Sequence, residues 1–226
     1  MWLGNGRRSG KENQDLRLKA LQLEEVLKRR RMVRAFDPSP IEPAVLNKIL
    51  NSLFQAPSAG FTQGLEVLVL DNLESIEQFW SLTFSSSEKR SAFRWQGLFD
   101  APVLLIPVVS PDAYAIRYGE PDKAASGLGE LSKWNVPYWW VDGGMGVMAG
   151  LLRAVDEDLG ALFFGLFENE ASVLKAFDVP SNYRALGAIA LGYPGSDVPG
   201  SDEPGRSASR PRRSHDDVIH RNRWRS

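Results

Sequence analysis

The chain of 226 residues contains no cysteine, so disulfides, thiolate nucleophiles and cysteine-ligated metals are excluded. Histidine is almost as scarce. His215 and His220 are the only two, and a Ser-His-Asp triad or a histidine metal site would have to be built from them. No run of residues approaches the ~20 apolar positions that a membrane-spanning helix needs. We therefore expect no metal site and no membrane partner.

Net charge is also nearly absent, because 27 Lys and Arg residues are balanced by 28 Asp and Glu residues. This balance excludes binding to nucleic acid through the surface as a whole, so any anion site must be local. An apolar content of 43% and a charged content of 24% are ordinary for a globular protein. The lack of cysteine agrees with a reducing compartment, and we expect a cytoplasmic protein.

The composition divides the chain into four parts. Residues 1–18 are charged and lack an apolar segment, so we expect a flexible leader and not a secretory signal. Residues 19–194 are expected to form one domain. Residues 195–209 are rich in Gly, Ser, Pro and Asp, which is typical of a linker. Residues 210–226 form a basic tail that we expect to dock on the domain or on a partner subunit.

Hydrophobic periodicity predicts the helices and strands of the domain. Helices are expected at residues 16–30, 43–56, 72–81, 88–98, 142–158 and 168–177. Strands are expected at residues 65–70, 102–109, 161–167 and 185–193. The two kinds of element do not alternate strictly, which favours an α+β fold over a doubly wound sheet.

An arginine cluster occupies RRRMVRAF, residues 29–36, with four arginines in six positions. Arginines at the end of a helix can simply stabilise its last carbonyl groups and face water. A second cluster, Arg210, Arg212 and Arg213, follows the linker, which could carry it back across the molecule. Guanidinium groups bind phosphate through charge-assisted, often bidentate hydrogen bonds. Our hypothesis is that both clusters meet at one anion.

Two further motifs have a structural and a functional interpretation. Gly144, Gly146 and Ala149 have the spacing of a dinucleotide-binding fingerprint, but they lie inside a helical pattern without a preceding strand. We favour a helix that is thin on one side, so that another helix can approach it closely. Residues 110–140 form a long irregular segment whose aromatic side chains either stack on a planar ligand or fill a core.

Several segments, taken in order, resemble the FMN-dependent nitroreductase family. RRRMVRAF and APSAGFTQG are similar to its opening arginine motif and to the turn after its first long helix. VDGGMGVMAGLLRAVDEDLGALFFGLFE resembles its central helix and the strand that follows. VLKAFDVPSNYRALGAIALGYP and RRSHDDVIHRNRW resemble its closing strand and tail. The resemblance extends from about Leu21 to Trp224.

The resemblance implies a fold and an activity. The fold would be α+β, with a mixed central sheet flanked by helices, in an intertwined homodimer with a swapped C-terminal tail. The activity would be that of an FMN-dependent oxidoreductase. A hydride from NAD(P)H would pass through flavin N5 to a nitroaromatic, quinone or related small acceptor by a ping-pong mechanism. No catalytic side chain, metal or nucleic acid is needed, and residues 118–140 would form the substrate lid.

The resemblance also implies which residues bind the cofactor. Arg30, Arg31, Met32 and Arg34 match the basic segment at the flavin, whose phosphate Arg212 and Arg213 would also reach. The segment Pro57, Ser58, Ala59, Gly60 and Phe61 matches the turn that lines the flavin from the partner subunit. Phe164, Gly165 and Leu166 fall where a backbone N–H approaches flavin N5 and stabilises negative charge on the reduced ring.

Two positions depart from the family pattern. Met32 replaces the usual Ser and Phe61 replaces the usual Asn, and each change removes a polar group from the flavin site. One alternative is therefore a flavin-binding protein without significant turnover. Another is a protein whose basic tail binds nucleic acid or an acidic partner.

Overall fold

The computed structural model describes residues 22–84, 86–166, 169–195 and 209–224. The expected leader lies outside these residues, as does the expected linker apart from its two end residues. The helices are α2 Leu23–Arg29, α3 Pro43–Leu53, α4 Leu73–Thr83, α5 Ser87–Ser91, α6 Pro111–Gly119, α7 Tyr138–Asp156, α8 Glu170–Ala176 and α9 His215–Val218. The strands are β1 Phe36–Asp37, β2 Leu65–Leu70, β3 Val103–Val109, β4 Gly160–Phe164, β5 Arg184–Ala185 and β6 Ala188–Pro194.

The strands form one sheet around the buried strand β3. β2 and β6 pair with β3 in antiparallel register, and β4 pairs antiparallel with β6. The two-residue strands β1 and β5 extend this sheet at β6 and β3. A single parallel bridge joins Met32 to Ala161. The α+β class is thereby confirmed.

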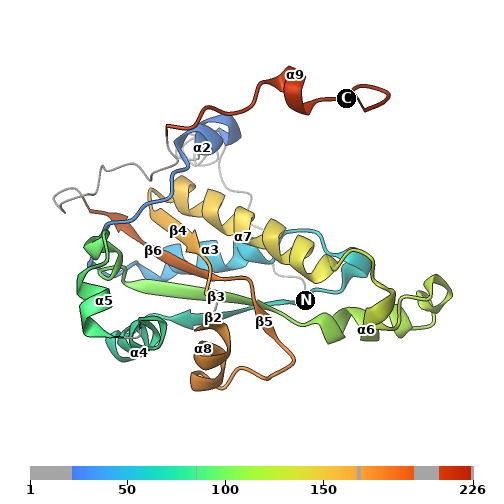
Figure 1. Cartoon of the computed structure of the whole chain (residues 1–226), viewed down its shortest axis with the longest axis horizontal. Coiled ribbons are helices and arrows are strands. Elements are labelled where there is room, and N and C mark those ends of the chain that lie inside the picture. The colour runs from blue at the N-terminus through green and yellow to red at the C-terminus, as the bar shows by residue number, and fades with distance from the viewer. Residues whose placement is uncertain (1–21, 85, 167–168, 196–208, 225–226) are drawn as a thin grey trace, which may run out of the picture.

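Helices cover both faces of the sheet (Figure 1). β3 alternates its side chains between two cores, as a strand buried on both faces must. Leu104 and Ile106 belong to the core beneath α4 and α8. Val103 and Leu105 belong to the core beneath α3 and α7. The expected strand at residues 102–109 is therefore confirmed as a fully buried one.

The small residues of α7 allow close packing within the chain. A Cβ on Gly146 would lie 2.6 Å from the carbonyl oxygen of Leu53, and one on Gly150 would lie 2.9 Å from the Leu53 side chain. The thin side of this helix therefore accepts α3, and the structural interpretation of the glycine motif is confirmed. The opposite side of α7 exposes Tyr138, Val141, Met145 and Met148.

Three expected boundaries are wrong. Residues 110–140 contain α6, which begins with Pro111 at its first position and with Ser110 as its cap, and α7 already begins at Tyr138. The helix expected at residues 88–98 is divided into α5 and a short 3₁₀ helix, Gln96–Leu98. The Gln96 amide donates to three carbonyl oxygens of the interrupted segment, which satisfies the groups that a continuous helix would have paired.

Candidate functional site

A pocket of about 510 Å³ lies where β4 ends. One part of its lining is the stretch from Leu162 to Leu166, and Arg34 also lines the pocket. Another part comes from α4 and the segment that follows it: Trp80, Thr83, Phe84, Phe93, Trp95 and Leu98. The structure therefore brings together Arg34 and the β4 end, two of the groups expected at the flavin. We call this the Arg34 pocket.

Backbone pairing explains why the arginine segment reaches this pocket. The Val33 N–H donates to the Ala161 carbonyl oxygen at 3.0 Å, next to the Met32–Ala161 bridge. Gly160 permits the approach, because a Cβ there would lie 2.8 Å from the Val33 side chain. The segment that carries the arginines is thus fixed along β4, whose other end forms the pocket wall.

Arg34 is held over an aromatic ring. Its guanidinium carbon lies 4.9 Å from the centroid of the Trp95 ring, within the range of a cation–π interaction. Its Nη1 donates to the Met32 carbonyl oxygen at 3.0 Å. The indole N–H groups of Trp80 and Trp95 are buried, and neither has a hydrogen-bond partner among the described residues.

Arg30 and Arg31 differ in what their guanidinium groups contact. Nη1 of Arg30 is buried, and within the described part of the chain it has no hydrogen-bond partner. Nη1 of Arg31 donates to the carbonyl oxygens of Lys28 and Arg30 at the end of α2. Arg31 therefore stabilises the helix end, whereas Arg30 retains a buried cationic donor, which suits an anion.

The segment Pro57–Phe61, which was expected to line the flavin from a partner subunit, is not part of the Arg34 pocket. Pro57 and Ser58 line a smaller pocket of about 170 Å³, together with Tyr114 and Asp142, and this pocket shares no lining residue with the Arg34 pocket. Figure 1 places α6, which packs on this segment, at the opposite end of the sheet from α4. Within one chain, the structure does not bring this segment to the arginines.

Residues 58–62, which we call the 58–62 turn, are held by a buried carboxylate. Oδ2 of Asp142 accepts from the Ala59 N–H and from the Tyr114 hydroxyl, both at 2.8 Å. Burial, together with this hydrogen bond, raises the pKa of the Tyr114 phenol well above its ordinary value. Tyr114 therefore remains a protonated donor to Asp142 at any ordinary pH.

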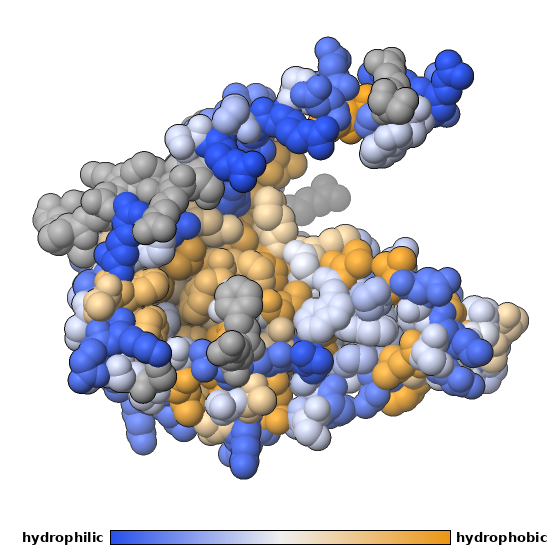
Figure 2. All heavy atoms as spheres, viewed as in Figure 1, coloured by the Kyte–Doolittle hydropathy of each residue, from blue (hydrophilic) through white to orange (hydrophobic). Residues whose placement is uncertain are grey.

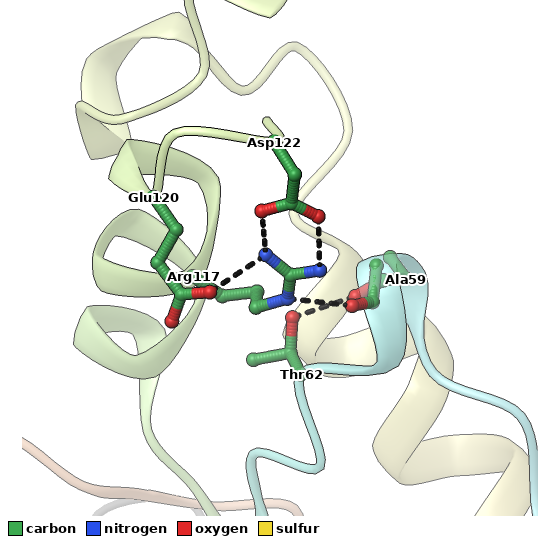
Figure 3. Close-up of polar contacts among 6 residues, drawn as sticks. Ala59, Thr62, Arg117, Glu120 and Asp122 are labelled. Atoms are coloured by element: carbon green, nitrogen blue, oxygen red, sulfur yellow. Dashed lines mark hydrogen bonds and ion pairs between the residues drawn. The ribbon is translucent and has the colours of Figure 1, made fainter. Parts of the chain in front are cut away.

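Arg117 also holds the turn (Figure 3). Its Nε donates to the Gly60 carbonyl oxygen at 2.9 Å. Its two terminal nitrogens form a bidentate pair with Asp122 at 2.7 and 2.8 Å, and Nη1 also donates to Glu120. The hydroxyl of Thr62 donates to the Ala59 carbonyl oxygen at 2.6 Å, so the turn is bonded internally as well.

The turn presents an aromatic side chain outward. Gly60 and Phe61 have φ values of 62° and 55°, in the left-handed region that residues with a side chain seldom adopt. The Phe61 residue is 76% exposed. Phe61 could therefore have its expected role at a flavin only if a second molecule packs against the turn.

The arginines of the tail were expected to reach the same anion as the first cluster. Arg212 and Arg213 are exposed, and Nη2 of Arg213 donates to the Asp217 carbonyl oxygen at 2.7 Å. Figures 1 and 2 show the tail with α9 extending past α2 and away from the sheet. The idea that both clusters meet at one anion therefore stays a prediction about an assembly.

Sequence reasoning missed the aromatic wall of the pocket and the supports of the turn. The density of aromatic residues between Phe79 and Phe99 could have indicated the wall. Nothing local indicated Asp142, because it belongs to an ordinary helix and its partners lie 28 and 83 positions away. Among the described residues, no cluster of acidic or histidine side chains could hold a metal ion, and no helix there has the length and apolarity to cross a bilayer.

The chain and its fold are similar to known proteins. A model of the nitroreductase family matches residues 27–193. The fold is similar to a nitroreductase family protein from Streptococcus pneumoniae, with a TM-score of 0.66 and 18% identity over 88% of this chain and 99% of that one. Nitroreductase A from Vibrio parahaemolyticus gives 0.65 and 20% over 92% and 79%. An FMN-dependent nitroreductase from Clostridium difficile gives 0.59 and 20% over 88% and 98%.

Proposed function

Because the chain belongs to the nitroreductase family, we propose that it is an FMN-dependent oxidoreductase. The observation that carries this proposal is the Arg34 pocket. It combines a guanidinium group, aromatic walls and the backbone at the end of β4. Its volume of about 510 Å³ is in the range of small-molecule sites. Such a lining suits a planar ring that carries an anionic group.

The residues present fit FMN. The buried Nη1 of Arg30 has no partner among the described residues, and an unpaired charged donor is costly unless an anion meets it. Arg30 and Arg34 would hold the anionic and polar parts of the cofactor. The exposed backbone at Gly165 would face the ring. When bound, FMN would take a hydride from NAD(P)H and pass two electrons to a nitroaromatic, quinone or related acceptor in a ping-pong cycle.

We further propose that the active form is a homodimer. The 58–62 turn and the Arg34 pocket lie at different ends of one chain, so the turn could line such a pocket only in a second copy. α7 exposes Tyr138, Val141, Met145 and Met148 on one side, and Figure 2 shows apolar residues gathered over this part of the molecule. A second copy would cover this surface. It would also receive the tail with its exposed Ile219 and Trp224.

The test of the cofactor is the visible absorption spectrum of the purified protein, before and after FMN is added and the sample is desalted. We expect retained oxidised-flavin bands. Steady-state oxidation of NADPH with a quinone or a nitroarene then distinguishes an enzyme from a flavin-binding protein without turnover. If no flavin is retained after reconstitution, the cofactor assignment is wrong, and the basic tail becomes the next candidate for binding an acidic partner.

A further inference from the structure

We propose that Arg117 is a positioning residue that fixes the 58–62 turn, so that Phe61 is presented in one orientation to the flavin site of a second copy. The part of this proposal that concerns flavin rests on the proposed function. The part that concerns the turn rests on contacts within the chain. These contacts join residues far apart in sequence and come from one segment, α6 and the residues that follow it.

The first step concerns the backbone of the turn. Phe61 and Gln63 each have a positive φ of 55°. Gly60, which directly precedes Phe61, has a φ of 62°. Non-glycine residues in this region carry strain, which persists only where the surroundings enforce it. The turn therefore needs external contacts to keep its conformation.

The second step identifies the enforcing group. The Nε of Arg117 donates to the Gly60 carbonyl oxygen at 2.9 Å, directly before Phe61 in the chain. Asp122 and Glu120 fix the same guanidinium from the other side, with contacts of 2.7 to 2.8 Å. Figure 3 shows Arg117 between these carboxylates and the turn. A donor held this rigidly restricts the peptide plane between Gly60 and Phe61.

The third step concerns the neighbour of Arg117. The ring of Tyr118 lies so close to Gly60 that a Cβ there would be 2.8 Å from it. Arg117 thus bonds the carbonyl group of Gly60 while Tyr118 closes the space beside its α-carbon. With both contacts made, the 76% exposed Phe61 has its backbone fixed but its side chain uncovered. An exposed aromatic residue on a fixed, strained backbone is arranged for contact with another molecule.

The experiment has one arm that needs no flavin. Hydrogen exchange is measured for the amides of Ala59, Phe61, Thr62 and Gln63 in wild type, Arg117→Ala and Arg117→Lys. We expect exchange at these amides to rise about tenfold in Arg117→Ala, as for the loss of one charge-assisted hydrogen bond. The matched control is Arg184→Ala, because Arg184 forms a bidentate pair with Glu170 on another element. Unchanged exchange in Arg117→Ala overturns the proposal.

The second arm is a double-mutant cycle on FMN affinity and on the visible circular dichroism of bound flavin. If Arg117 acts through Phe61, Arg117→Ala weakens FMN binding about tenfold in wild type and has no further effect in Phe61→Ala. Both variants should also alter the dichroism band alike. Losses that multiply in the double variant would show that Arg117 does not act through Phe61. Absence of FMN binding by wild type would sink the cofactor assignment, and the exchange arm would still decide whether Arg117 fixes the turn.

Discussion

The Arg34 pocket and the arginine segment that leads to it contain buried donors without partners among the described residues, whereas the polar groups of the 58–62 turn are hydrogen-bonded within the chain. Arg30, Trp80 and Trp95 each bury a nitrogen for which the described residues supply no acceptor. In the turn, by contrast, the Ala59 N–H donates to Asp142 and the Gly60 carbonyl oxygen accepts from Arg117. Native proteins pair most buried polar groups, and unpaired ones point to strain, function or a missing ligand. The 58–62 turn is therefore fixed by contacts within the chain, whereas Arg30, Trp80 and Trp95 each keep a buried nitrogen that no described residue pairs.

The largest expected effect comes from removing the carboxylate of the turn. Asp142→Ala deprives the Ala59 N–H and the Tyr114 hydroxyl of their acceptor and should lower the free energy of unfolding by about 3 kcal/mol. Asp142→Asn is the matched control. Both bonds end on one oxygen atom, so an amide oxygen can still accept them. Denaturant unfolding of both variants measures the difference, and equal losses would contradict the role of the acceptor.

Substitutions of the two arginines Arg30 and Arg34 should change the affinity for FMN more than the free energy of unfolding. Arg30→Ala and Arg34→Ala should each weaken FMN binding by about 1–3 kcal/mol, the range for a charged hydrogen bond. Arg30→Ala should not lower the free energy of unfolding of the flavin-free protein, because it removes a costly buried donor without a partner in the described chain. Fluorescence titration with FMN measures the affinity.

The control for these arginines is Arg29→Ala, since Arg29 is paired with Asp158 on the surface. We expect wild-type affinity for FMN in that variant. If Arg30→Ala and Arg34→Ala also bind FMN as tightly as wild type does, the phosphate assignment is wrong.

Substitution of two glycines by alanine tests how tightly the backbone is held in the turn and in α7. Gly60→Ala places a side chain at positive φ and against Tyr118, and it should lower the free energy of unfolding by about 1–2 kcal/mol. Gly144→Ala meets no atom within 4 Å, and it should raise helix stability by about 0.5–1 kcal/mol. Thermal and denaturant unfolding provide the measurement. A stable Gly60→Ala protein would show that the turn is not fixed.

The smallest effect depends on pH. The hydrogen bonds from Arg117 lower the pKa of the Asp122 carboxyl group below its ordinary value. The resulting stabilisation is fully present above the ordinary aspartate pKa of about 3.9 and is lost as the pH falls through the lowered value. Asp122→Asn should therefore be less stable than wild type at neutral pH, while the two unfolding curves converge in acid. A difference that persists in strong acid would contradict the ionic contribution.

Local patterns were sufficient for much of the fold. The continuous apolar run of residues 102–109 indicated a strand buried on both faces, and β3 is one. The small residues of α7 indicated close packing, and Gly146 accepts the backbone of Leu53. The sequence does not predict α6, although Ser110-Pro111 is a good helix start, because the aromatic and glycine residues that follow are typical of an irregular segment.

The site was harder to predict, because its contacts join distant positions. Arg34 lies over Trp95, which is 61 residues further along the chain. The Asp142 carboxylate is a functional support only because folding places it beside Ala59. Composition and hydrophobic periodicity do not predict which distant residues form such pairs. The resemblance to a family implied which residues would bind flavin, and the structure shows which residues hold the 58–62 turn.

The placement of α6 has a consequence for protein engineering. The segment between the end of β3 and the start of α7 contains residues 118–140, which were expected to form a substrate lid, so it is an obvious region to exchange between homologues. In this chain it also contains Tyr114, Arg117 and Tyr118, all of which brace a turn 50 or more residues earlier in the sequence. A graft of the whole segment would remove those braces together with the loop. A graft limited to residues 123–136 would retain them.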